Sequence, residues 1–185
     1  VDAASRDPQA RFRRGLLRRD LRDLDGALAD FDRAIGLDPE FTAAYVARGA
    51  LYQAAGRHAV AQRDFDRALA TAPGDGAALT HKAVSQCAEG RFARCAATAE
   101  RAIARRPDDW RAHVAKGHAL LGLEDPAAAV RAYGEAIERA PAGQAHWLLA
   151  RLQKHLRPRL SDRRGVGWAF LAAEDVDQAR TVLRE

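Results

Sequence analysis

The chain has 185 residues and carries 30 lysines and arginines against 25 aspartates and glutamates, which gives a net charge of +5. No apolar run approaches the roughly 18–20 residues that a membrane-spanning helix needs, and no signal peptide opens the chain, so we predict a soluble protein of the cytoplasm or periplasm. Nearly all of the positive charge is arginine, as GC-rich bacterial coding favours, so the charge alone does not indicate a nucleic-acid partner. The chain contains no methionine, even at position 1, which we interpret as a processed protein or a fragment of a longer one.

The apolar periodicity and the positions of proline predict helices in four consecutive pairs. Asp7 and Asp125 each precede a proline in a first helical turn, and Asp75 and Asp109 stand where they can cap two further helices. Proline cannot continue a helix, so the second helix of each pair should end shortly before a proline. The predicted helices span residues 8–21, 25–37, 42–55, 58–71, 76–88, 92–105, 110–122 and 126–139.

Four sets of residues recur with a period of 34 along this part of the chain. A small residue in each first helix faces a small residue in the second, and an aromatic side chain then fills the wider space further along. The third unit departs from the pattern, because it has alanine at the aromatic position. The sets are the small residues Gly15, Gly49, Ala83 and Gly117, the facing residues Ala27, Ala61, Cys95 and Ala129, the aromatic positions Phe31, Phe65, Ala99 and Tyr133, and the closing prolines Pro39, Pro73, Pro107 and Pro141.

A 34-residue period with small, aromatic, small and proline positions resembles the tetratricopeptide repeat over about residues 8–141. The resemblance implies an all-α solenoid of the bacterial type, in which antiparallel helix pairs stack and each pair contacts only its neighbours. The resemblance also implies that the function is the binding of other proteins. The predicted divisions are an N-terminal tail at 1–7 and repeats at 8–41, 42–75, 76–109 and 110–143.

After Pro141 the repeat register is lost, and the C-terminal residues admit two interpretations. The apolar spacing within residues 144–159 predicts an amphipathic helix, either an extra one or a cap. Residues 160–185 match the fourth repeat at a spacing of 50, as Gly167 with Gly117, so they form either a partial fifth repeat or a cap. If the array continues beyond Glu185, a solenoid that stops there exposes the apolar side of its last helix and self-associates through it. That face comprises Val176, Ala179, Val182 and Leu183.

In the family that this chain resembles, the first helices line a concave groove that takes a peptide or a helix of a partner. The corresponding surface here is mostly small and apolar, which predicts a protein partner. The alternative is that the added helix at 144–156 covers this surface as core. One subclass grips the C-terminal carboxylate of chaperones with lysine and asparagine pairs; this chain lacks them, so binding of such tails is excluded. The predicted groove residues are Phe12, Leu16, Arg19, Val46, Ala50, Gln53, Thr80, Val84, Cys87, Arg111, Val114, His118 and Leu121.

No catalytic triad, phosphate-binding loop or paired carboxylate stands out, so we predict no enzymatic activity and no cofactor. None of the six histidines forms the pair that a metalloprotease helix needs, and we predict no metal site. Cys87 and Cys95 are separated by seven residues, which is not a zinc-site spacing. Because Cys95 occupies an alanine position, we expect two buried free thiols, although a disulfide between the helix ends is geometrically conceivable.

Two arginine-rich clusters could meet an acidic partner, a membrane surface or RNA. The first lies within residues 11–22 and is interleaved with acidic residues, which favours a solvated face. Arg11 and Arg18 there replace large residues of the repeat pattern, as expected for an edge unit with a solvated outer face. The second cluster extends from Arg151 to Arg164 and is less compensated. Its predicted basic patch consists of Arg157, Arg159, Arg163 and Arg164.

The leading hypothesis is therefore a non-catalytic scaffold for protein–protein interaction that holds a partner peptide or helix in its groove. Two alternatives stay open. The chain is a repeat segment of a larger bacterial envelope protein for polysaccharide export, assembly or surface reception. Otherwise it is a module that binds RNA or another polyanion through the second arginine cluster, although a nucleic acid is the less favoured partner.

Overall fold

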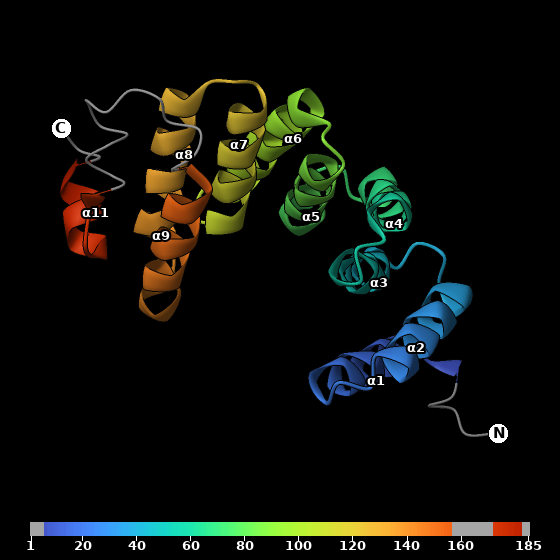
Figure 1. Cartoon of the computed structure of the whole chain (residues 1–185). Helices are drawn as coiled ribbons and strands as arrows, with labels where there is room; N and C mark the ends of the chain where they lie inside the picture. Colours follow the sequence, from blue (N-terminus) through green and yellow to red (C-terminus); the bar gives the residue numbers. More distant parts are fainter. Residues whose placement is uncertain (1–5, 157–171, 183–185) are drawn as a thin grey trace. The chain divides into compact units, whose positions relative to one another are not determined.

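The computed structural model describes residues 6–156 and 172–182, and these ranges contain ten helices and no strand (Figure 1). The all-α prediction is thus confirmed for the described part of the chain. The chain divides into two compact units, Val1–Glu89 and Gly90–Glu185, which we call unit 1 and unit 2. Unit 1 contains α1 (Pro8–Asp20), α2 (Leu24–Leu37), α3 (Thr42–Ala54), α4 (His58–Thr71) and α5 (Gly76–Ala88). Unit 2 contains α6 (Phe92–Arg105), α7 (Trp110–Gly122), α8 (Pro126–Arg139), α9 (Ala142–Leu156) and α11 (Val176–Val182).

Aspartate side chains cap the first turns of five of the eight helices α1–α8. Asp7 and Asp125 accept hydrogen bonds from backbone N–H groups in the first turns of α1 and α8, both at 2.9 Å. Asp75 and Asp109 do the same for α5 and α7, at 2.8 and 3.2 Å. These four predicted caps are confirmed. Asp23 also caps α2, at 3.0 Å, although the sequence analysis did not identify it.

Within each complete helix pair, the aromatic side chain of the second helix lies against a glycine of the first. The rings of Phe31 and Tyr133 are fully buried. A Cβ atom at Gly15 would come within 2.6 Å of the Phe31 ring, and one at Gly117 would collide with Tyr133. The glycine is therefore required by the ring, because a close-packed interior leaves no space for the extra carbon. The third repeat has alanine at both positions.

Unit 1 is built from the pairs α1–α2 and α3–α4, with α5 packed against α3 and α4. One part of its core consists of Ala27 and Phe31, against which Phe12 and Leu16 are partly buried. The Phe12 ring also approaches the Phe41 ring, with 5.0 Å between the ring centres. The first helix of the chain is thus held by apolar contacts both to its own partner and to the start of α3.

Unit 2 has one continuous apolar core that includes the added helix α9. Leu148, Leu149 and Leu152 of α9 are buried together with Tyr133 and Ile137 of α8. The helix starts at Ala142, slightly earlier than the sequence predicted. The apolar stripe of α9 therefore extends the core of unit 2.

The short helix α11 also belongs to this core, which overturns one expectation. Val176 is 4% exposed and Ala179 is fully buried, because α11 packs against α8 and α9. The apolar side of the last helix is therefore not exposed at these two positions, and self-association through this end stays a prediction. Leu183 and the register residue Gly167 lie outside the described residues.

The expectation of two free thiols is wrong in this structure. Both Cys87 and Cys95 are disulfide-bonded. Cys87 lies in the last turn of α5 and Cys95 in the first turn of α6, and only Glu89–Arg91 connects these helices. The sequence analysis weighted the alanine-like packing of Cys95 above this short connection. Within residues 6–156 and 172–182, no helix is long and apolar enough to cross a membrane.

Candidate interaction surface

The predicted groove residues of unit 1 lie on its first helices, α1, α3 and α5. Their apolar members are half-buried, so each side chain contributes to the fold and still keeps part of its surface in water. Arg19 is exposed and forms an ion pair with Asp20 at 2.9 Å. The half-buried apolar members, which we call the unit 1 apolar surface, are Phe12, Leu16, Val46, Ala50 and Val84.

Two other predicted residues of unit 1 serve the fold. Thr80 is 4% exposed, and its hydroxyl donates to the Gly76 carbonyl oxygen at 2.9 Å. The Gln53 amide donates to the Ser85 hydroxyl at 2.8 Å, and its oxygen lies 2.8 Å from Nδ1 of His81. Gln53 thus joins α3 to α5 through both ends of its amide, so its polar atoms already have hydrogen-bond partners within the fold.

In unit 2 the predicted residues lie on α7, in different environments. Arg111 is exposed, whereas Val114 and His118 are half-buried. Leu121 is 6% exposed and belongs to the core, so it does not line a surface. The His118 ring meets the buried Tyr133 ring edge to face, with 5.6 Å between centres. His118 is therefore the predicted residue that the core orients most directly.

His118 also borders an open hollow that the sequence analysis missed. The hollow has a volume of about 360 Å³ and is lined by His118 of α7 and by Arg151, Leu152 and Lys154 of α9. Arg151 and Lys154 are exposed, and Leu152 forms the buried floor. The sequence predicts residues 144–159 as an extra or capping helix. The sequence does contain a signal for this site: Arg151 and Lys154 are three residues apart, on one face of a helix that contains no aspartate or glutamate.

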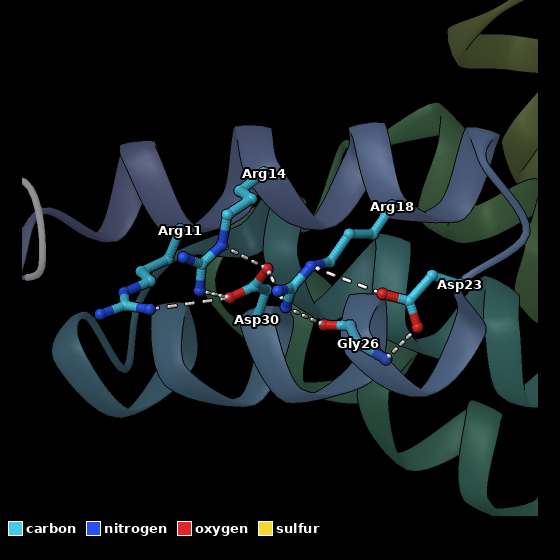
Figure 2. A network of polar contacts seen from close by, with 6 residues as sticks. All are labelled: Arg11, Arg14, Arg18, Asp23, Gly26 and Asp30. Carbon is cyan, nitrogen blue, oxygen red and sulfur yellow. Dashed lines mark hydrogen bonds and ion pairs between the residues drawn. The ribbon is translucent and has the colours of Figure 1, made fainter.

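A polar network in the first helix pair surrounds one buried carboxylate (Figure 2). Asp30 of α2 has a side chain only 3% exposed, and three arginines of α1 converge on it. Arg14 donates from Nε at 2.8 Å and from Nη2 to the other carboxylate oxygen. Arg18 donates from Nη1 at 2.9 Å, and Arg11 lies 3.9 Å away.

This geometry lowers the pKa of Asp30, chiefly through the hydrogen bonds from Arg14 and despite the opposing effect of burial. The same hydrogen bonds raise the pKa of Arg14. Arg11 and Arg18, predicted to lie on a solvated face, are partly exposed and also contact a buried carboxylate. Both side chains turn toward Asp30, which the sequence analysis did not consider because Asp30 is sixteen residues from Arg14 and lies on the other helix.

The second repeat uses the same arrangement and extends it to its neighbour. Arg48 donates two hydrogen bonds to Asp64 of its own repeat, at 2.9 and 2.6 Å. Its third nitrogen donates to Asp32 of the preceding repeat at 2.7 Å. The hydrogen bonds to Asp64 are the main cause that raises the pKa of Arg48. One guanidinium thus joins two repeats.

The third and fourth repeats have lysine where the second has Arg48, and each lysine forms an ion pair with the preceding repeat. Lys82 pairs with Asp66, and Lys116 pairs with Glu100 at 3.1 Å. These pairs again span sixteen residues, as Arg48 and Asp32 do. The same position of each repeat therefore holds a basic side chain that is paired within the fold. Because each of these charges already has an acidic partner, it is less available to a binding partner than an unpaired cation would be. The residues are Arg14, Arg48, Lys82 and Lys116.

The buried His113 is held within the fold by both of its ring nitrogens. His113 is 2% exposed, and its two ring nitrogens lie 2.8 Å from the Pro107 carbonyl oxygen and 2.8 Å from a Glu135 carboxylate oxygen. No three side chains of His, Cys, Asp or Glu gather as a metal site would require, among the residues that the structure describes. The predicted basic patch of the second cluster (Arg157, Arg159, Arg163 and Arg164) lies outside those residues.

Comparison with known families and structures agrees with the repeat pattern. The family model described as tetratricopeptide repeat matches residues 1–45, 46–109 and 114–157. A crystal structure of MamA is 18% identical, with a TM-score of 0.66 over 92% of this chain and 94% of that chain. MamA from Desulfovibrio magneticus RS-1, from residue 41 onward, is 19% identical, with a TM-score of 0.65 over 72% of this chain and 76% of that chain. At these identities the likeness shows the fold alone. No curated protein matches the chain.

Proposed function

The chain belongs to the tetratricopeptide repeat family, and we propose that it is a non-catalytic scaffold whose first helices bind a peptide or a helix of a partner protein. The observation that carries the proposal is the unit 1 apolar surface defined above. A soluble protein gains by covering such side chains, at about 25 cal/mol for each Å² of apolar area removed from water. Partner helices and extended peptides are the usual occupants of surfaces formed by adjacent helices.

The distribution of hydrogen bonds supports an apolar mode of binding in unit 1. Of the polar members of the predicted surface in unit 1, Gln53 and Thr80 have their side chains engaged within the fold, and Arg19 is paired with Asp20. The basic residue Arg48 is held by two aspartates. Apolar side chains are thus the groups in this part of the surface that still gain from a partner, and Val46 and Val84 are suitable positions for a test.

The experiment compares capture of a partner by the folded chain and by a charged variant. The chain is purified, immobilised and exposed to an extract of the organism that encodes it, and a protein retained by the wild type is identified and quantified. Val46→Asp with Val84→Asp should reduce retention of that protein at least about tenfold, since two apolar contacts become buried charges. The matched control is Ala59→Asp with Ala70→Asp, which adds the same charge at two exposed positions of α4.

Circular dichroism must first show that each variant keeps the wild-type helix content. If the aspartate pair unfolds the chain, Val46→Gln with Val84→Gln replaces it, because glutamine removes the apolar contact without adding charge. Equal retention by the wild type and by a folded double variant would show that the partner does not use this surface.

A further inference from the structure

The hollow between α7 and α9 differs in character from the unit 1 apolar surface. Among the residues that the structure describes, its lining consists of the basic side chains His118, Arg151 and Lys154 and of Leu152. No carboxylate of the described residues lines it. The two helices that form it, Trp110–Gly122 and Ala142–Leu156, contain no aspartate or glutamate at all.

Two carboxylates of unit 2 have partners away from the hollow. Glu100 pairs with Lys116 at 3.1 Å, and Glu135 lies 2.8 Å from His113. Among the residues that the structure describes, no carboxylate comes within ion-pair distance of Arg151 or Lys154. Two exposed cations at adjacent positions of one helix face, with no internal counter-charge, create a local positive potential.

An exposed tryptophan adjoins these cations. Trp147 is 56% exposed, and the Arg151 guanidinium lies 5.2 Å from the centre of its ring. The contact orients the guanidinium, because a cation over an aromatic face is attracted to it. Trp147, Arg151 and Lys154 are spaced by four and three residues, so they lie on one side of α9. This side therefore combines an aromatic surface with two cations, of which Arg151 is oriented by the ring.

We propose that the hollow bordered by His118, Arg151 and Lys154 binds an acidic peptide segment of the partner, with a carboxylate between the two cations and an adjacent apolar side chain against Trp147. This inference rests on the proposed function, since it names the chemical class of the partner at the unit 2 part of the first-helix surface. The argument is charge complementarity, because a carboxylate supplies the counter-charge that α7 and α9 lack.

The size and lining of the hollow favour a peptide over a nucleic acid. A nucleic-acid site needs several cations that follow a phosphate backbone, and its affinity depends on the number of phosphates that it neutralises. Here two cations flank one hollow of about 360 Å³ with an apolar floor at Leu152. Such a site suits one or two carboxylates of an extended peptide.

The test uses a fluorescein-labelled hexaglutamate peptide as the probe, with hexalysine and a short oligouridylate as comparisons. Binding to the whole chain is measured by fluorescence anisotropy at about 50 mM salt, where exposed charges are weakly screened. Arg151→Glu with Lys154→Glu should weaken hexaglutamate binding about tenfold or more. The matched control is Arg94→Glu with Arg101→Glu, which makes the same charge change at two exposed positions of α6 and should alter binding by less than about twofold.

A second readout places the peptide at α9. Hexaglutamate should quench tryptophan emission in the wild type, and Trp147→Phe should remove most of that quenching while the helix content stays unchanged. If the glutamate pair unfolds unit 2, Arg151→Gln with Lys154→Gln replaces it, and a several-fold loss of affinity is then expected.

Three outcomes would overturn the inference. They are no hexaglutamate binding, an equal loss in the control variant, or tighter binding of oligouridylate that the same substitutions remove. The proposed function has a separate readout, because its test depends on Val46 and Val84 in unit 1. If the wild-type chain does not bind hexaglutamate but partner retention is still lost on substitution of those valines, the acidic site alone is rejected.

Discussion

Unit 1 and unit 2 are built from the same repeat, yet they differ at one buried position. The position holds Asp30 and Asp64 in unit 1 and Thr98 and Ala132 in unit 2, and all four residues are buried. Each aspartate faces an arginine sixteen residues earlier, whereas the corresponding residue before Ala132 is Lys116. The helix pair can therefore form with or without a buried carboxylate.

The difference indicates why the basic residue that faces this position is arginine in some repeats and lysine in others. A guanidinium is a planar fork that can hold two carboxylates at once, as Arg48 does with Asp64 and Asp32. A lysine is a single point charge, and Lys116 has a single acidic partner, Glu100. Where the buried aspartate is absent, the chain has lysine in place of arginine. We interpret the two positions as one coupled unit of the repeat.

The largest expected effect on stability comes from placing an aspartate at position 132 of unit 2, which is equivalent to Asp30 and Asp64 of unit 1. Ala132→Asp should lower the free energy of unfolding by about 3 kcal/mol or more, because Lys116 is already paired with Glu100 and cannot satisfy a second carboxylate fully. Adding Lys116→Arg should recover about 1 kcal/mol or more. Urea titrations of the wild type, both single variants and the double variant give the coupling energy. Additivity of the two changes would contradict the coupled interpretation.

An intermediate effect is expected from removing the carboxylate where it occurs naturally. Asp64→Ala should cost about 2–3 kcal/mol, because Arg48 is only 20% exposed at its side chain and loses two charge-assisted hydrogen bonds. Thr98→Ala at the equivalent position should cost less than about 1 kcal/mol. Thermal and urea unfolding measure both. A comparable loss for the two variants would show that the carboxylate is incidental.

The smallest effect concerns pH and the first repeat. Asp30→Asn should cost about 1 kcal/mol near neutral pH, less than the change at Asp64, because Arg14 and Arg18 are 48% and 36% exposed and can return to water. The pKa of Asp30 is lowered in the folded chain, chiefly by Arg14. Its stabilisation is therefore present above the ordinary aspartate pKa of about 3.9 and is lost as the pH falls through the lower folded value.

Denaturant midpoints of the wild type and Asp30→Asn, measured between about pH 7 and pH 3, check this expectation. The gap between the two proteins should narrow below about pH 4 as Asp30 becomes protonated in the unfolded chain. A gap that stays constant to the lowest pH at which the chain folds would mean that Asp30 stabilises by packing alone.

The sequence by itself determined the helix pairs, their caps and the family. This was possible because these features depend on local rules or on the 34-residue period: glycine and aromatic residues sixteen apart, aspartate before a first turn, proline after a last turn. The half-buried apolar positions of α1, α3 and α5 could be identified in the same way, by carrying the repeat register along the chain.

Only the tertiary structure decided which polar and apolar groups are already used. Arg11 and Arg18 turn to Asp30 on another helix, Gln53 joins α3 to α5, and Leu121 enters the core. The sequence pattern places a residue on a helix face but does not state which neighbour satisfies it, since the partners are distant in the chain. The hollow at Arg151 and Lys154 was missed for the same reason, because it exists only where α9 lies beside α7.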